Sequence, residues 1–239
     1  MARPDYGDAE FCAGCHQFNF PLFAAGSAPR SRRDDEPGDS GTPDQAGQVI
    51  GYSKFPMQNT VAQFRTGPHR EDRCLDCHSR GAGGHTFPGA HDPAMLTRAL
   101  TYKLCRDAAA LRLTLTNQGA GHNVPTGDVH RHIVARLWRS TSPERLFEAR
   151  LGRRYAPVPG GGKRTTVDTT LPPGHSQTHR IPLQSLGLVT KSDESIRFEL
   201  RYVYTIDEFP LPNQQLSEPT FAIIAAETVL PSALPACTP

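Results

Sequence analysis

The feature that most constrains this chain is a five-residue pattern that occurs twice. Residues 12–16 are CAGCH and residues 74–78 are CLDCH, so each segment has two cysteines with two residues between them and a histidine directly after. Four of the six cysteines lie in these two segments. The spacing is the attachment signature of c-type haem, and two copies in one histidine-rich chain make it specific.

The pattern has a chemical reason. Two thiols at this spacing can add to the vinyl groups on one edge of a porphyrin, and the adjacent histidine then ligates the iron. We therefore expect two covalently attached haem c groups, whose macrocycles would also supply apolar surface to the residues around them. The expected binding residues are the thioether cysteines Cys12, Cys15, Cys74 and Cys77 and the proximal iron ligands His16 and His78.

CxxC pairs have two other common uses in proteins. In structural zinc sites the two CxxC pairs are usually closer to each other in the sequence than the pairs 12–15 and 74–77 are here. A zinc-bound interaction module stays as an alternative interpretation. A thioredoxin-like redox pair needs a βαβ context, which the first hundred residues do not offer.

Two haem irons have four axial positions, and the two proximal histidines fill half of them. Eight of the ten histidines remain, and we expect His/His ligation at both irons because histidine is abundant near the motifs. The candidates for the distal positions are His69, His85, His91 and His122. A Gly/Pro turn whose histidine only hydrogen-bonds locally is the alternative for His122.

Residues 1–104 carry both motifs and only weak periodicity, which predicts a mostly irregular and α-helical haem-binding region with few short helices. Residues 26–48 mix charge, Gly, Pro and Ser without apolar spacing, which predicts a flexible loop. A short helix is expected at 59–65, with Asn59 as its N-cap, and another at 92–102, capped by Asp92.

From residue 105 to residue 239 apolar and polar side chains alternate in short runs, which predicts an antiparallel β-sandwich. The clearest run is 111–117, in which Leu111, Leu113 and Leu115 would share one face. Residues 195–204 repeat the pattern, and weaker runs lie at 132–140, 165–172, 175–183 and 220–230.

The two remaining cysteines, Cys105 and Cys237, bear on location. Haem c attachment implies an oxidising space such as the periplasm, where thiols pair, so we expect a disulfide between them; two unrelated free thiols are the alternative. The sequence as given has no export signal at its start, and a periplasmic or extracellular location is nevertheless expected.

Charge and hydropathy exclude some partners. The chain has 26 Lys+Arg against 24 Asp+Glu, so nothing indicates a nucleic acid or an anionic membrane surface. No apolar run approaches the roughly 18 residues of a membrane span.

The ordered motifs CxxCHQF, MQNT, CxxCH, HTFPGAHD and NxGAGHNVPTGD resemble those of a group of bacterial multihaem c-type cytochromes, in which a compact haem region precedes a β-sandwich. The resemblance covers about residues 8–138 and rests mainly on the two CxxCH motifs and GHNVPTG. It implies His85 and His122 as distal ligands, with His91 in reserve. The chain departs from the family in having Ser79 and Arg80 where relatives often have Met-Pro, so the resemblance does not define the haem packing at these residues.

Two six-coordinate haems leave no open position for a substrate, so we expect a dihaem carrier of single electrons between redox partner proteins, without catalysis. The alternative is a haem enzyme, either a peroxidase or a reductase of small oxyanions. It would need one five-coordinate iron, with polar groups such as His91, Arg70 or Arg80 on the open side.

Overall fold

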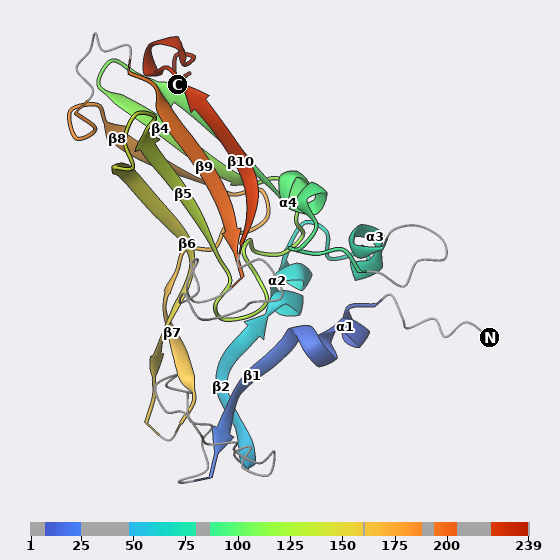
Figure 1. Ribbon diagram of the computed structural model, residues 1–239. Coiled ribbons are helices and arrows are strands. Elements are labelled where there is room, and N and C mark those ends of the chain that lie inside the picture. The colour runs from blue at the N-terminus through green and yellow to red at the C-terminus, as the bar shows by residue number, and fades with distance from the viewer. Residues whose placement is uncertain are drawn as a thin grey trace, which may run out of the picture.

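The computed structural model describes residues 8–24, 48–79, 87–159, 161–187, 194–204 and 221–238. Antiparallel sheets dominate this part of the chain, and its helices are few and short (Figure 1). Of the loop expected at 26–48, all but the last residue lies outside the described residues. None of the described helices has the length and apolar character that crossing a membrane requires.

Both CxxCH motifs come before most of the described strands in the chain. The helices are α1 (Ala9–His16), α2 (Thr60–Thr66), α3 (Cys74–His78), α4 (Pro93–Ala99) and the 3-10 helix η3 (Pro231–Ala233). The strands are β1 (Gln17–Phe23), β2 (Val49–Asn59), β3 (Leu100–Arg106), β4 (Ala110–Asn117), β5 (His132–Arg139), β6 (Arg145–Pro157), β7 (Lys163–Asp168), β8 (Ser176–Pro182), β9 (Ile196–Val203) and β10 (Phe221–Val229).

Eight strands form two antiparallel sheets, ordered β10-β9-β5-β6-β7 and β3-β4-β8. We call β3 to β10 the two-sheet region. Its two sheets share one hydrophobic core, which includes Leu113 of β4, Ile133 of β5 and Phe198 of β9, all fully buried. The alternation at 111–117 is confirmed, because the leucines of β4 are buried while the residues between them are only partly so.

Strand β3 runs across position 104, where the sequence suggested a boundary. Helix α4 begins as expected, since the Asp92 side chain accepts hydrogen bonds from the N–H groups of Ala94 and Met95. It ends at Ala99, however, and the next residues pair with β4 instead of continuing the helix. Pairing along a whole strand outweighs a modest helix preference, so Leu96 of α4 and Leu100 of β3 join the core of the two sheets.

The N-terminal residues contain more strand than expected, which corrects the prediction of a mostly irregular and α-helical region. Strands β1 and β2 pair as an antiparallel two-stranded ribbon with an irregular register. The two segments are too far apart in the sequence for a hairpin turn to reveal the pairing. We call residues 8–24 and 48–79, which hold this ribbon and helices α1 to α3, the CxxCH region.

The CxxCH region is joined to the two-sheet region by side chains. Phe20 of β1 packs edge-on against Tyr155 of β6, with ring centroids 5.4 Å apart. The hydroxyl groups of Thr60 and Thr126 are hydrogen-bonded at 2.7 Å. The β1–β2 ribbon and the paired ends of β6 and β7 lie side by side in the lower part of Figure 1, where β2 contacts β7.

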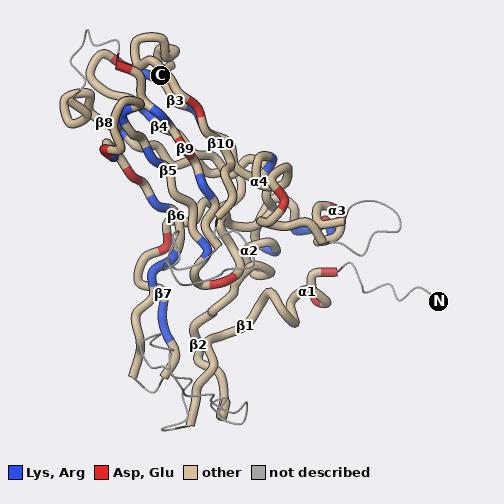
Figure 2. Tube along the Cα trace, viewed as in Figure 1, with Lys and Arg blue, Asp and Glu red and all other residues tan. Residues whose placement is uncertain are grey.

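Charged residues of both signs are interspersed along the strands of the larger sheet (Figure 2). Several are paired, for example Arg136 with Glu148 at 2.8 Å and Arg139 with Glu144 at 3.1 Å. This pairing fits the small net charge of +2, which gives no reason to expect a strongly charged partner.

The C-terminal tail is fastened to β3 by a disulfide between Cys105 and Cys237, the pair expected from the sequence. Backbone hydrogen bonds support it: Arg106 N–H donates to Pro235 O at 2.9 Å, and Cys237 N–H donates to Arg106 O at 3.0 Å. The tail therefore continues the edge of the β3-β4-β8 sheet.

Candidate cofactor site

Each CxxCH motif forms a short helix, α1 or α3. Because residues three apart lie on the same face of a helix, the two thiols of each motif are on one side, and the histidine follows the second thiol. Neither helix contains a buried residue. The motif helices therefore have no buried side chains of their own. Their surfaces are accessible, so a bound group could cover them.

The first cysteines of the two motifs are neighbours. The Cys12 and Cys74 thiols are close enough to influence each other electrostatically. Burial raises the pKa of the Cys74 thiol to about 11, and the neighbouring Cys12 thiol adds to the shift. Groups attached to both motifs would thus lie close to each other.

His78, the histidine of the second motif, is oriented by the backbone. Its Nδ1 lies 2.6 Å from the carbonyl oxygen of Pro88. A carbonyl only accepts, so Nδ1 carries the proton, and Nε2 is the bare nitrogen when the ring is neutral. This is the arrangement by which proteins hold an imidazole that binds a metal.

His122 lies in the loop between β4 and β5 and is held in the same way. Its Nδ1 donates to the carbonyl oxygen of Asn123 at 3.0 Å, which leaves Nε2 free to act as a ligand. Burial lowers the pKa of His122, an effect that the Asn123 carbonyl opposes and that the nearby imidazoles of His78 and His16 reinforce. His122 is therefore neutral at pH 7, as a metal ligand must be.

The rings of His78 and His122 lie near each other, with nearly parallel planes. Their centroids are 6.1 Å apart, and their planes differ by only 15°. Two imidazoles that bind one metal ion from opposite sides, through bonds of about 2.0 Å, have ring centres roughly 6 Å apart. Two histidines that come from different regions of the molecule thus have the spacing of a pair of axial ligands.

Two glycines let the His122 loop approach its neighbours closely. A side chain at Gly119 would run into the carbonyl oxygen of Arg98 at the end of α4. A Cβ at Gly121 would lie 3.1 Å from the Phe64 ring of α2 and from Cβ of His69. The GAGH sequence is thus explained by contact with both α2 and α4.

The other expected ligands are arranged differently. His69 has its Nδ1 2.8 Å from Asp72 Oδ2, which leaves its Nε2 available, and it is about half exposed. His91 stacks on Tyr204 with ring centroids 4.2 Å apart, and its Nε2 faces Arg131 at 3.4 Å. His16 is exposed, and His85 lies outside the described residues. Among the described residues, the expected ligands that lie close together with nearly parallel rings are His78 and His122.

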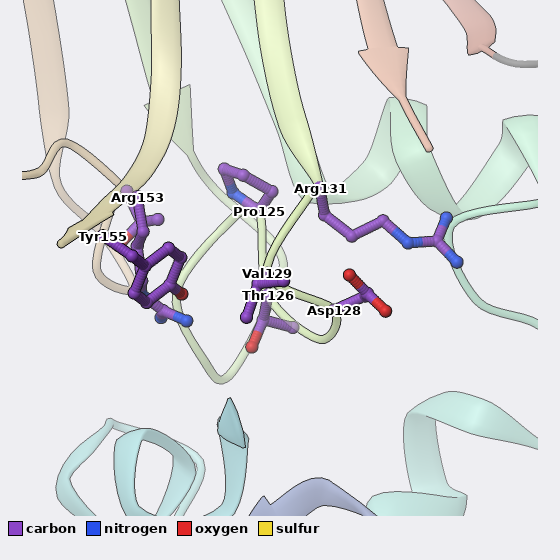
Figure 3. Close-up of a pocket in the computed structure, with 8 residues that line it drawn as sticks. Pro125, Thr126, Asp128, Val129, Arg131, Arg153 and Tyr155 are labelled. Atoms are coloured by element: carbon purple, nitrogen blue, oxygen red, sulfur yellow. The ribbon is translucent and has the colours of Figure 1, made fainter. Parts of the chain in front are cut away.

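A small pocket is lined by residues that follow His122 in the chain and by residues of β6 (Figure 3). On one side Arg153 lies beside Tyr155, while Arg131 points away from both. Arg153 Nε donates to Asp168 at 3.1 Å, and its Nη2 is buried with no hydrogen-bond partner in the described part of the chain. The pocket is lined by Pro125, Thr126, Asp128, Val129, Arg131, Arg153, Tyr155 and Thr170.

Some features of the site were not foreseen from the sequence. The carbonyl groups of Pro88 and Asn123 orient the two imidazoles, but backbone acceptors leave no residue-type signal. Among the described residues, no group of three or more Cys, His, Asp or Glu side chains is arranged to hold a bare metal ion.

Comparison with known proteins identifies a solved structure with a similar fold. No protein-family model and no curated protein matches the sequence. A solved structure with a similar fold is the crystal structure of a penta-heme cytochrome c552 from Thermochromatium tepidum, with a TM-score of 0.59 and 21% sequence identity. The similarity covers 93% of this chain and 56% of that chain, so this chain spans little more than half the length of that protein. At this level of identity, the comparison shows a shared fold.

Proposed function

We propose that this protein is a c-type cytochrome that transfers single electrons through two covalently attached haems. The observation that carries the proposal is the pair His78 and His122, 6.1 Å apart and nearly parallel, with His78 at the end of a CxxCH helix. The shared fold with a penta-heme cytochrome c552 supports it. This chain has two CxxCH motifs, so two haems are proposed.

The donor set of the second motif fits a haem c. Cys74 and Cys77 would form the thioethers, His78 would be the proximal ligand and His122 the distal ligand. The haem supplies the one-electron couple. The chain's own part is to hold both imidazoles with Nδ1 on a carbonyl, so that Nε2 stays unprotonated and correctly oriented.

For the first motif, Cys12 and Cys15 would form the thioethers and His16 would be the proximal ligand. We propose His85 or His69 as its distal ligand. His69 is supported by its Asp72 partner, because a carboxylate on Nδ1 is a common companion of a metal-bound imidazole. His91 is less suited, since its ring is stacked on Tyr204 and its Nε2 faces Arg131.

With both irons six-coordinate, the chain would exchange electrons with partner proteins at a haem edge and would not bind substrate at the iron. The two-sheet region would be a β-sandwich that supplies His122 and other residues that surround the haem. Covalent haem attachment and the Cys105–Cys237 disulfide both suit an oxidising location, so we propose that the protein works in the periplasm or outside the cell.

The test is to produce the chain behind an export signal in a host that attaches haem c, and to count the haems by intact mass and by a pyridine haemochrome assay. Two haems per chain are expected, both low-spin and both insensitive to carbon monoxide in the reduced state. A protein without haem would contradict the proposal and favour a zinc module. One gas-binding haem in the unmodified protein would instead indicate an enzyme.

The ligand assignment has its own test. His122→Ala should convert one haem to a high-spin, gas-binding form, and His91→Ala should leave both haems low-spin. His69→Ala and His85→Ala then decide the distal ligand of the first haem. If His122→Ala leaves both haems unchanged, His122 is not a ligand.

A further inference from the structure

We propose that Asn117 is the residue that positions His122, so that Asn117 determines whether the iron bound by His78 is closed to external ligands. The inference rests on the proposed function, in which His122 is the distal ligand. Asn117 is the last residue of β4, and it is a polar side chain with 0% exposure at the end of a strand whose inward neighbours are leucines. A buried amide in such a place must have hydrogen-bond partners.

The Asn117 amide bonds to the His122 loop from inside. Its Nδ2 donates to the carbonyl oxygen of His122 at 2.9 Å, and its Oδ1 accepts from the N–H of Ala120 at 3.1 Å. The two bonds fix the backbone on either side of Gly121. The histidine's own carbonyl is therefore held in place, which limits where its ring can point.

The same amide joins this loop to the segment that leads into β8. Nδ2 of Asn117 also donates to the carbonyl oxygen of Leu171 at 2.9 Å. Val124 and Leu171 exchange two backbone hydrogen bonds of 2.9 Å each. The Asn117 backbone adds two more bonds, to Gly174 at 2.8 Å and to His175 at 3.0 Å. The His122 loop is thus attached to a second, independent stretch of chain.

A further side chain completes the attachment on the other side of His122. Asn123 Nδ2 donates to Thr170 Oγ1 at 2.9 Å, and Thr170 in turn donates to Asp168. The Asn123 carbonyl is the group that accepts the His122 Nδ1 proton. Asn117 therefore fixes the backbone of His122, while Asn123 fixes the rotation of its ring.

Asparagine is required here because the site needs two N–H donors and one acceptor on a short planar group. Aspartate has the same shape but loses both donors, and leucine has a similar volume but offers no partner to three backbone groups. A buried group that loses its partner costs roughly 1–3 kcal/mol, so the loop would rearrange to reach water. His122 would then leave its position near His78.

The experiment compares Asn117→Asp with Leu115→Ala in the haem-loaded protein. Leu115 is also fully buried on β4, and its apolar side chain forms no hydrogen bond, so its truncation weakens the same core without removing a hydrogen bond to the His122 backbone. We expect Asn117→Asp to convert one of the two haems to a high-spin form that binds carbon monoxide, as His122→Ala does. We expect Leu115→Ala to lower the melting temperature while both haems stay low-spin.

Hydrogen exchange on the unmodified protein gives a second readout that does not need the variant to fold. The N–H groups of Ala120 and Val124 should exchange slowly compared with exposed loop amides, since the Asn117 side chain and the Leu171 carbonyl accept from them. Fast exchange at both would overturn the inference. So would a folded Asn117→Asp protein in which both haems remain low-spin.

The outcomes separate this inference from the proposed function. If the unmodified protein has no haem, or if His122→Ala changes nothing, the function or the ligand assignment fails. If His122→Ala opens one iron and Asn117→Asp does not, only the positioning role of Asn117 fails.

Discussion

The two-sheet region and the CxxCH region are built on different principles. The first buries leucines and isoleucines from both sheets in one core together with Phe198, and Leu113 and Phe198 have 0% exposure. In the second, helices α1 and α3 contain no buried residue, although they carry all four motif cysteines. A sheet with one apolar face can form its own core, whereas a short motif helix needs a bound group to cover it.

The difference explains why the sequence was informative about one region and less so about the other. Alternation over 111–117 and 195–204 predicted β4 and β9, because a strand with one buried face has a period of two. Strand β6 was missed, because arginines, a glutamate and Gly152 interrupt its apolar positions, and its extended form is imposed by pairing with β5 and β7.

The candidate site divides in the same way. The CxxCH motifs and the list of candidate histidines could be read from the sequence, because covalent attachment depends on residues adjacent in the chain. The proximity of His78 and His122 could not, since it joins residues 44 positions apart on different regions. The role of Asn117 depends on backbone carbonyls and therefore also needed the fold.

The strongest test of this difference between the two regions is to remove all four motif cysteines in one variant. The substitutions are Cys12→Ser, Cys15→Ser, Cys74→Ser and Cys77→Ser. We expect the loss of both haems and fast hydrogen exchange throughout the CxxCH region, while the two-sheet region stays protected. Exchange measured by mass spectrometry checks this. Unchanged protection of α1 and α3 would show that the CxxCH region folds without a bound group.

A change in the sheet core should have the opposite effect. Leu113→Ala should cost roughly 3–5 kcal/mol of unfolding free energy, because it leaves a cavity where a fully buried side chain was. Denaturant unfolding measures the loss, and both haems should stay low-spin below the transition. The control is Thr114→Ala, on the opposite face of β4, which loses one hydrogen bond to Thr178 and should cost about 1 kcal/mol. Equal costs for the two variants would contradict the assigned core face.

Removing the disulfide should weaken the two-sheet region by a smaller amount. Cys105→Ser with Cys237→Ser should cost about 2–4 kcal/mol, since the bond restricts the unfolded chain over a separation of 132 residues. Thermal unfolding with and without a reductant provides the measurement. The haem spectra should not change, because neither cysteine lies in a motif. A variant as stable as the unmodified protein would argue that the tail is held by its backbone hydrogen bonds alone.

The smallest expected effect is a pH dependence at the turn between β3 and β4. Hydrogen bonds from the N–H groups of Ala109 and Ala110 lower the pKa of Asp107, and nearby Arg180 and Arg112 add to this. A carboxylate with a lowered folded pKa stabilises the fold above its unfolded pKa, and that contribution is lost as the pH falls through the folded value. The stability difference between the unmodified protein and Asp107→Asn should thus be present at pH 7 and shrink below about pH 4. A difference independent of pH would contradict this role of Asp107.

The central claim is that one iron is bound between His78, from the CxxCH region, and His122, from the two-sheet region. A crystal structure of the haem-loaded protein, with the iron atoms located by anomalous scattering, tests it most directly. The account predicts an iron between the two imidazoles, bonded to Nε2 of each, while Nδ1 of each remains on the carbonyl oxygens of Pro88 and Asn123. An iron at His78 whose opposite position is empty or held by another residue would contradict the account.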